Sequence, residues 1–318
     1  WGGVCGTLPD LDSFIDHGDP VRNMTFHRAE SHALFYLTLA SVPLAWLISR
    51  VGREPELFKR WWLAVWLALI THPLLDLMTV YGTQLALPFS DYPFGVGSVF
   101  IIDPLYTLPL LIGAVAAVAM RGQGSALRWN AAGLVLSTAY LAWSVGAQQI
   151  ATSAARDSLR AQGIEPRQLL VTPTAFNTVL WRIVARVPGG YYEGFYSLLD
   201  KDRNVAFDYF KSDDALYDKL RDQWAVARIA WFTHGLFAIS EQDGVVRISD
   251  LRMGQEPNYA FTFAVAVRNS PTLSPINPEA IEMPVDVDAM LDWLWRRLRG
   301  DPLKPPRGGT ASTTLDFN

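Results

Sequence analysis

The sequence predicts an α-helical polytopic membrane domain followed by an extramembrane α+β domain. Three observations lead to this fold class. Four long apolar stretches follow one another between residues 33 and 150. Lys and Arg gather in two of the loops that separate these stretches, and residues 151–318 have the mixed composition of a soluble domain. This asymmetry along a chain of 318 residues predicts two domains of different kind.

The four apolar stretches are residues 33–49, 61–81, 104–120 and 129–150. Each is close to the length that crosses roughly 30 Å of hydrocarbon. Buried helices of a large soluble protein are the alternative, but four such stretches in succession are hard to bury otherwise. We therefore expect residues 1–150 to form a membrane domain of about four spans. Because the chain starts at Trp1 without an initiator Met, we also expect a further helix upstream.

The charges of the loops predict an orientation. Two loops carry the basic residues, one between the first and second stretches and one between the third and fourth: Arg50, Arg53, Lys59, Arg60, Arg121 and Arg128. The loop over residues 82–102 contains neither Lys nor Arg. By the positive-inside rule the basic loops face the cytoplasm. The sequence thus predicts a multi-pass protein of a bacterial inner membrane with an extracytoplasmic C-terminal domain.

The second half reads as a small α+β domain over residues 151–300. Alternating residues around Pro188-Gly189-Gly190 and around Asp243-Gly244 predict two hairpins, and residues 260–267 predict another strand. Residues 213–232 and 285–298 are amphipathic and predict helices. The tail over residues 301–318, rich in Pro, Gly, Ser and Thr, is predicted to be disordered.

The composition excludes several classes of protein. The net charge of −4 argues against a nucleic-acid partner, which would be met by a basic face. The single cysteine, Cys5, excludes both a disulfide framework and a cysteine-based zinc site. Any metal ion must therefore be held by histidine and carboxylate side chains.

Six such side chains gather near the ends of the apolar stretches: Asp10, Asp12, His27, His32, His72 and Asp76. The spacing of His72 and Asp76 places both on one face of a helix. In an apolar span such groups are costly unless they bind something. We therefore predict that the six hold divalent metal ions, most plausibly zinc. The alternatives are a turn with an N-cap for the aspartates, solvated side chains for the first two histidines, and a helix-locking hydrogen bond between His72 and Asp76.

The sequence suggests roles for three further residues, Asp103, Arg28 and His234. Asp103 precedes Pro104, as an N-cap does, and a general base or an additional ligand is its second interpretation. Arg28 could help to neutralise charge on a phosphoryl group. His234 is followed by Gly235, which predicts the end of a helix rather than a ligand.

Several motifs occur in an order that resembles the membrane-bound metal-dependent hydrolases of the YdjM-like, LexA-regulated family. They are Gly-Thr-Leu-Pro-Asp-Leu-Asp at 6–12, His-Arg at 27–28 with Ser-His at 31–32, Thr-His-Pro-Leu-Leu-Asp at 71–76, and Ile-Asp-Pro-Leu-Tyr-Thr at 102–107. The resemblance covers residues 1–150. It implies a helical inner-membrane protein, distantly similar to zinc-dependent phospholipase C and P1-type nucleases. One departure is Ala29, where the family usually has glycine after His-Arg.

The first functional hypothesis is a metal-dependent hydrolase of the membrane surface. Divalent cations would activate a water molecule for attack on a phosphodiester. Membrane lipids would be its partners, and its substrate would be a lipid or a lipid-linked molecule. The step from a metal site to a phosphodiester rests on the resemblance alone. A metal-binding transporter and a metal-stabilised membrane scaffold without catalysis are the alternatives.

Overall fold

The structure, a computed structural model, describes residues 1–121, 123–269 and 272–307. This part of the chain divides into two compact units. The first consists of residues 1–96, 213–253 and 259–282, and the second of residues 97–212, 254–258 and the described residues from 283 onward. The predicted division at residue 150 stays a prediction. Most of the tail predicted to be disordered, residues 308–318, lies outside the described residues.

The predicted polytopic helical domain is wrong. Among the described residues, one helix is long and apolar enough to cross a membrane, α3 (Leu34–Val51). The predicted multi-pass topology, and the extracytoplasmic placement of the C-terminal domain that depended on it, therefore lose their support. The described chain instead has a helical N-terminal region followed mainly by antiparallel strands.

The other apolar stretches fail as spans for separate reasons. Helix α4 (Phe58–Asp76) carries Lys59 and Arg60 in its first turn, and it ends before residues 77–81 of the stretch that the sequence suggested. Helix α5 (Pro104–Ala119) has only 16 residues. Helix α6 (Ala126–Ala161) is long, but polar residues within the predicted stretch, among them Asn130, Ser137 and Gln148, make it less apolar than a span.

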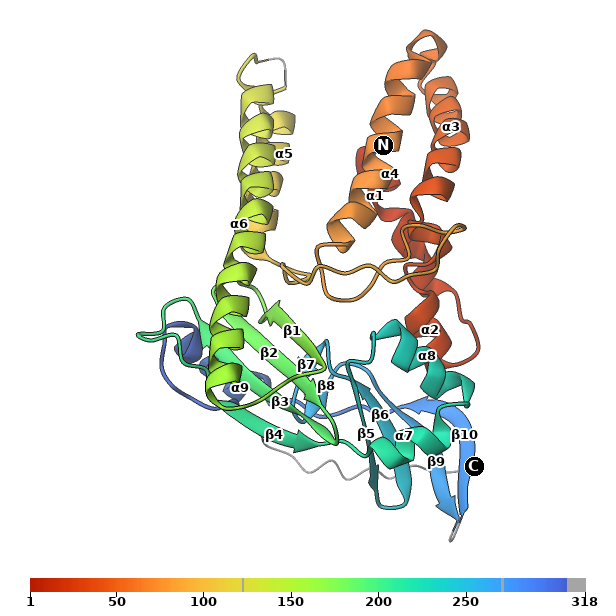
Figure 1. Ribbon diagram of the computed structural model, residues 1–318. Coiled ribbons are helices and arrows are strands. Elements are labelled where there is room, and N and C mark those ends of the chain that lie inside the picture. Colours follow the sequence, from red (N-terminus) through yellow and green to blue (C-terminus); the bar gives the residue numbers. More distant parts are fainter. Residues whose placement is uncertain (122, 270–271, 308–318) are drawn as a thin grey trace. The chain divides into compact units, whose positions relative to one another are not determined.

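The N-terminal part of the first unit consists of helices. Short elements come first: α1 (Gly2–Thr7), the 3-10 turn η1 (Pro9–Phe14), α2 (Pro20–Phe26) and the 3-10 turn η2 (Glu30–His32). After α3, the turn η3 (Pro55–Leu57) leads into α4. Helices α3 and α4 lie side by side (Figure 1) and enclose a small apolar core that includes Ile48 and Leu69.

Two indole hydrogen bonds fix the alignment of α3 against α4. Trp62 Nε1 donates to Ser41 Oγ at 3.0 Å, and Trp66 Nε1 donates to Thr38 Oγ1 at 3.1 Å. Residues later in α4 are thus paired with residues earlier in α3. The start of α3 and the end of α4 consequently lie at the same end of the helix pair.

The first unit also contains a four-stranded antiparallel sheet with the order β10-β9-β6-β5. Its strands are β5 (Phe237–Gln242), β6 (Val245–Asp250), β9 (Thr262–Asn269) and β10 (Thr272–Ala280). The predicted hairpin around Asp243-Gly244 and the predicted strand over 260–267 are confirmed. Both turn residues have positive φ, 53° and 76°, as a tight two-residue hairpin requires. Residues of α2, α8 and this sheet share one apolar core.

The helix predicted over residues 213–232 is two helices, α7 (Asp214–Leu220) and α8 (Trp224–Phe232). At the break, Gln223 turns toward the sheet instead of continuing the helix. Its Nε2 donates to the carbonyl oxygens of Val265 at 2.8 Å and of Ile276 at 3.3 Å. These tertiary bonds compensate for the helical bonds that are lost there.

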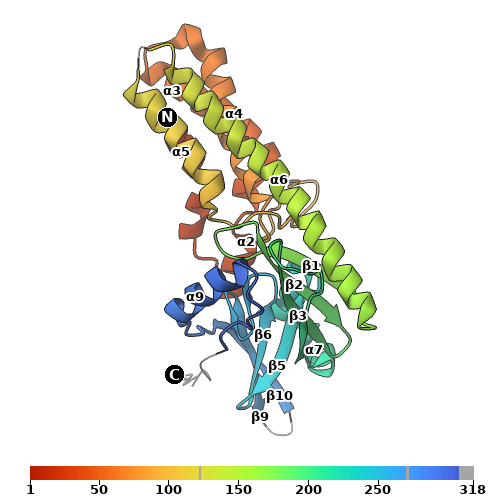
Figure 2. The ribbon, with the colours of Figure 1, turned by 90° about the vertical axis from the view of Figure 1, so that its left-hand side faces the viewer.

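The second unit contains α5, α6 and a second antiparallel sheet in sequential order (Figure 2). Its strands are β1 (Gln168–Pro173), β2 (Leu180–Val187), β3 (Gly190–Ser197) and β4 (Phe207–Lys211), so the hairpin predicted around Gly189 is confirmed. A two-stranded ribbon, β7 (Gly254–Gln255) with β8 (Asn258–Tyr259), is separate from both sheets. The helix predicted over 285–298 is α9 (Val287–Leu298).

Alternation along β2 explains how the second sheet is covered. Trp181 and Ile183 pack against the buried alanines of α6, whose small side chains allow close approach. Leu180, on the opposite face of β2, packs with Trp293 of α9. Because successive strand residues point to opposite faces, the two helices cover different faces of this sheet.

Candidate metal centre

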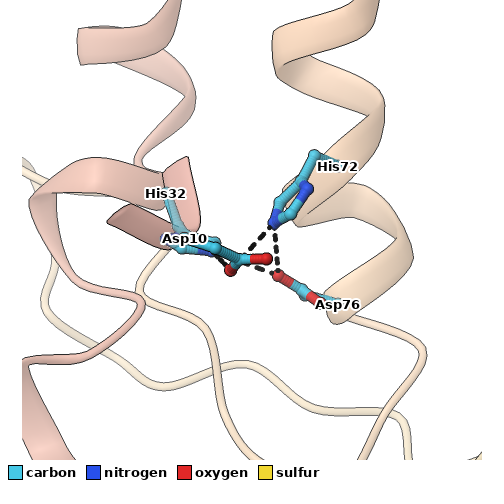
Figure 3. Close-up of side chains that lie close together, drawn as sticks. All are labelled: Asp10, His32, His72 and Asp76. Carbon is cyan, nitrogen blue, oxygen red and sulfur yellow. Dashed lines mark hydrogen bonds and ion pairs between the residues drawn. The ribbon is translucent and has the colours of Figure 1, made fainter. Parts of the chain in front are cut away.

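Two segments of the first unit, residues 10–32 and the end of α4, supply four potential metal ligands. Asp10 lies in η1 and His32 ends η2, just before α3 begins. His72 and Asp76 lie on the last turns of α4, one turn apart. Because α3 and α4 are aligned so that the start of one lies beside the end of the other, the two segments meet (Figure 3).

The four side chains form one compact group. One ligand atom from each of Asp10, His32, His72 and Asp76 lies within 4.8 Å of the other three. His32 Nε2 is 3.3 Å from both Asp10 Oδ1 and Asp76 Oδ2. His72 Nε2 is 3.2 Å from Asp10 Oδ1 and 3.4 Å from Asp76 Oδ2. Two imidazole nitrogens and two carboxylate oxygens form a donor set that suits zinc.

The facing atoms of this group are incompletely satisfied. His32 is fully buried, and neither its Nε2 nor Asp76 Oδ2 has a hydrogen-bond partner within the described part of the chain. Buried polar atoms without partners are rare because they cost free energy. A cation bound among the four groups would satisfy both atoms. The residues present therefore fit a divalent metal ion.

The side chains of the group differ in their exposure to solvent. The side chain of His32 is fully buried, that of Asp76 is 12% exposed, and that of Asp10 is 51% exposed. The group therefore has a closed side and an open side, and Asp10 lies at the open side. The open side at Asp10 is thus a side from which a small molecule can approach the centre.

The charges around the centre favour ionised carboxylates. Burial would raise the pKa of Asp76, but the nearby imidazoles of His32 and His72 and the charge of Arg28 lower it below the ordinary range. Burial alone would lower the pKa of His72, but the nearby carboxylates of Asp76 and Asp10 outweigh burial and raise this pKa. Asp76 is thus held in the ionised form that binds a cation.

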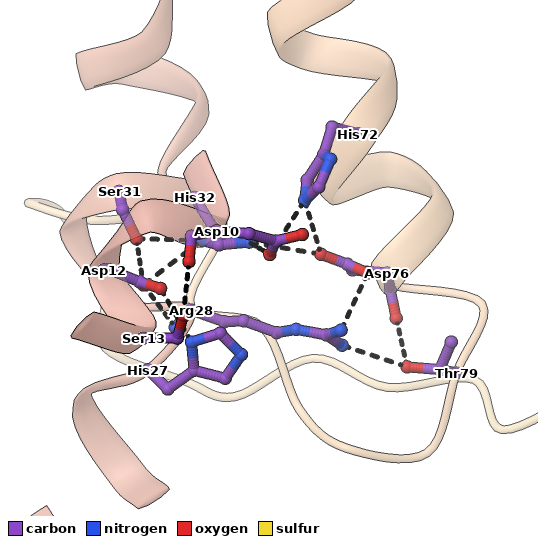
Figure 4. A network of polar contacts seen from close by, with 10 residues as sticks. All are labelled: Asp10, Asp12, Ser13, His27, Arg28, Ser31, His32, His72, Asp76 and Thr79. Carbon is purple, nitrogen blue, oxygen red and sulfur yellow. Dashed lines mark hydrogen bonds and ion pairs between the residues drawn. The ribbon is translucent and has the colours of Figure 1, made fainter. Parts of the chain in front are cut away.

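Asp12 and His27, two of the six predicted ligands, lie outside the group of four. His27 Nδ1 is 2.7 Å from Asp12 Oδ1, and the backbone N–H of Arg28 donates to Asp12 Oδ2 at 3.0 Å. Ser31 also donates to Asp12 Oδ2 (Figure 4). Burial would raise the pKa of Asp12, but these hydrogen bonds outweigh it and lower the pKa to about 2.

Arg28 lies beside the centre rather than at its open side. Its Nη2 is 3.1 Å from Asp76 Oδ1, and its Nη1 donates to Thr79 Oγ1 at 3.3 Å. The side chain is buried, and the guanidinium lies over the ring of Tyr81 at 5.0 Å. The backbone of Arg28 has a φ of 63°, an uncommon value for a residue other than glycine. These contacts suit a residue that orients Asp76.

Asp103 belongs to the second unit and is the N-cap of α5. Its Oδ1 accepts from the backbone N–H of Leu105 at 3.0 Å, and its Oδ2 accepts from the hydroxyl of Tyr140 at 2.8 Å. The N-cap interpretation is therefore confirmed, and the role of a general base stays a prediction. His234 follows the end of α8, and its Nε2 lies 3.0 Å from the carbonyl oxygen of Pro93.

Ser31 is the residue at this centre whose role the sequence analysis missed. Its Oγ lies between Asp12 and His32, at 2.8 Å from His32 Nδ1. The available signal was its position directly before a predicted ligand. A hydroxyl next to a histidine in a short turn can reach the ring nitrogen that does not bind the metal.

Comparison with known proteins gives one match. Residues 1–151 match the family model described as YdjM inner membrane protein, a span that includes all four residues of the group. No curated protein and no solved structure matches the chain. The expected similarity to zinc-dependent phospholipase C and P1-type nucleases therefore has no support from these comparisons.

Proposed function

We propose that this protein is a metal-dependent hydrolase of the bacterial inner membrane that cleaves a phosphoester of a lipid or a lipid-linked substrate. One observation carries the proposal. Two histidines and two aspartates from separate segments converge within 4.8 Å, and two of the buried facing atoms have no hydrogen-bond partner among the described residues. A set of this kind is costly to assemble for packing alone, because each buried polar group must be compensated.

The four residues would hold the cation, and Asp10 would complete the set from the open side. A bound divalent cation supplies Lewis acidity to a phosphoryl group and favours attack by water. Arg28 keeps one oxygen of Asp76 engaged, so that the other faces the centre. Asp103 has both carboxylate oxygens bonded within its own unit, and the proposal does not require it.

The position of the centre favours a substrate at the membrane surface. His32 lies two residues before α3, the helix that is long and apolar enough to cross a membrane. Phe35 and Tyr36, in the first turn of α3, are exposed, and so is Phe89, whose ring lies 5.5 Å from that of Phe35. Exposed aromatic side chains at the end of a span are typical of the membrane interface. The phosphate of a lipid lies at this level of a bilayer.

The proposal is tested with zinc content and hydrolysis measured on the same preparations. The full chain is purified in detergent as wild type, His72→Ala and Asp76→Ala, and bis(p-nitrophenyl) phosphate is the substrate. The control variant is His17→Ala, a histidine of the same unit that packs on Phe26 outside the group. Because one ligand atom from each of the four residues lies within 4.8 Å of the others, the group can surround a single ion, and we expect about one zinc ion per chain in the wild type and the control.

The outcomes separate the hypotheses. Zinc and hydrolysis lost together in both folded ligand variants, and kept in His17→Ala, would support the hydrolase. Zinc without hydrolysis of this substrate or of phospholipids would refute catalysis and favour a metal-stabilised scaffold. Wild-type protein without zinc or any other divalent metal would refute the metal centre itself.

A further inference from the structure

Ser31 lies between the carboxylate of Asp12 and the imidazole of His32 at the metal centre. Its Oγ is hydrogen-bonded to Asp12 Oδ2 on one side and lies 2.8 Å from His32 Nδ1 on the other (Figure 4). A serine hydroxyl has a single proton, so it can donate only one of these two bonds. The direction of the chain of bonds therefore decides which nitrogen of His32 carries a proton.

The backbone settles that direction. The N–H of Arg28 donates to Asp12 Oδ2 at 3.0 Å, and a backbone N–H can only donate. Asp12 Oδ2 is thus an acceptor, and Ser31 donates its proton to the same oxygen. The hydroxyl oxygen is then left to accept from His32, which must carry its proton on Nδ1.

We propose that Asp12 and Ser31 are positioning residues that hold His32 in the tautomer with the proton on Nδ1, so that Nε2 offers its lone pair to the metal ion. The inference rests on the proposed metal centre. It also gives Asp12, which lies outside the group of four, a defined task. Asp12 acts on His32 through Ser31 and not by contact with the metal.

Burial makes this arrangement necessary. His32 is fully buried, so water cannot bond to its Nδ1 and fix the tautomer. Without the hydroxyl, the neutral imidazole could place its proton on Nε2, where it would point toward the cation. Partners of this kind behind a ligating histidine typically change metal affinity by roughly 10–100-fold.

The test combines a direct view of the tautomer with zinc affinity. The ¹⁵N spectrum of the histidine-labelled, zinc-loaded full chain in detergent reports which ring nitrogen of His32 carries the proton, and His32→Gln identifies the resonance. Zinc alone is then titrated calorimetrically into wild type, Ser31→Ala and Ser31→Thr, because threonine keeps the hydroxyl. Ser90→Ala, an exposed serine in a loop, is the matched control.

We expect the Nδ1–H tautomer of His32 in the wild type and in Ser31→Thr, and a mixture in Ser31→Ala. Zinc should bind roughly 10–100-fold more weakly to Ser31→Ala, and with nearly wild-type affinity to Ser31→Thr and Ser90→Ala. A wild-type Nε2–H tautomer, or equal zinc affinity in Ser31→Ala, would overturn the inference. Zinc binding with the expected tautomer but without hydrolysis would refute the proposed function and leave this inference intact.

Discussion

Arg28 engages one oxygen of Asp76 and leaves the other to the metal centre. Its Nη2 lies 3.1 Å from Asp76 Oδ1, whereas Asp76 Oδ2 lies within 3.4 Å of the Nε2 atoms of His32 and His72. The guanidinium of Arg28 holds its N–H donors in one rigid plane, and its other terminal nitrogen, Nη1, donates to Thr79 Oγ1. The pair therefore determines which carboxylate oxygen faces the two histidines.

Replacing Arg28 by alanine should weaken zinc binding by roughly 10–100-fold, because Asp76 would lose both its orientation and a neighbouring positive charge. Zinc affinity measured by competition with a chelating dye would show this. Arg22→Ala is the control, since the side chain of Arg22 is 48% exposed and pairs with Asp19 outside the group. Equal affinity in Arg28→Ala and wild type would show that Asp76 needs no such support.

Removing the metal should destabilise the first unit. A ligand that binds only the folded state at about 100 times its Kd adds about 2.7 kcal/mol to the free energy of unfolding. We expect a chelator to lower the melting temperature of the wild type and added zinc to restore it. His72→Ala should melt at the lower temperature and respond to neither treatment. A chelator effect of the same size in His72→Ala would place the stabilising metal elsewhere.

The sequence predicted the pair on α4 better than the pair on η1. His72 and Asp76 share a face because a regular helix repeats every 3.6 residues, and the structure brings both into the group. Asp10 and Asp12 were expected to reach a common centre. They instead lie in a 3-10 turn, where residues two apart point in different directions. Asp12 consequently meets His27, and only Asp10 faces the other ligands.

The spans were overestimated because apolar runs do not end where helices end. The run over residues 61–81 continues past Asp76, although α4 ends there and the chain turns. Local signals did better. Turn residues at Gly189 and Gly244 placed two hairpins correctly, whereas β1, β4 and β10, which depend on pairing with the strand next to each of them in the chain, were not predicted. The pairing of α3 with α4 likewise depends on tertiary contacts.

Gly133 should tolerate no side chain. A Cβ added there would lie 2.4 Å from the carbonyl oxygen of Pro109 in α5, so that α5 and α6 would have to separate. We expect Gly133→Ala to lose about 1–3 kcal/mol of stability in a denaturant titration. Gly146→Ala, in the same helix with open space around it, is the control and should be stabilised by roughly 0.5–1 kcal/mol. Equal stability of the two variants would contradict the close contact.

Glu256 should make the stability of the second unit depend on pH. Burial raises the pKa of Glu256, the charge of Glu193 adds to this, and the hydroxyl of Tyr191, 2.5 Å from Oε2, opposes it. The folded state holds the proton on the Glu256 carboxyl more tightly than the unfolded state does. The stabilisation of the fold by this proton is therefore complete below the ordinary pKa of a glutamate. This stabilisation is lost as the pH rises through the folded pKa.

Melting temperatures of the wild type should therefore fall as the pH rises above the ordinary pKa of a glutamate, and Glu256→Gln, which cannot ionise, should remove this fall. Glu165→Gln, at an exposed position of the same unit, should keep the wild-type profile. A Glu256→Gln profile with the same slope as the wild type would show that another group governs the transition.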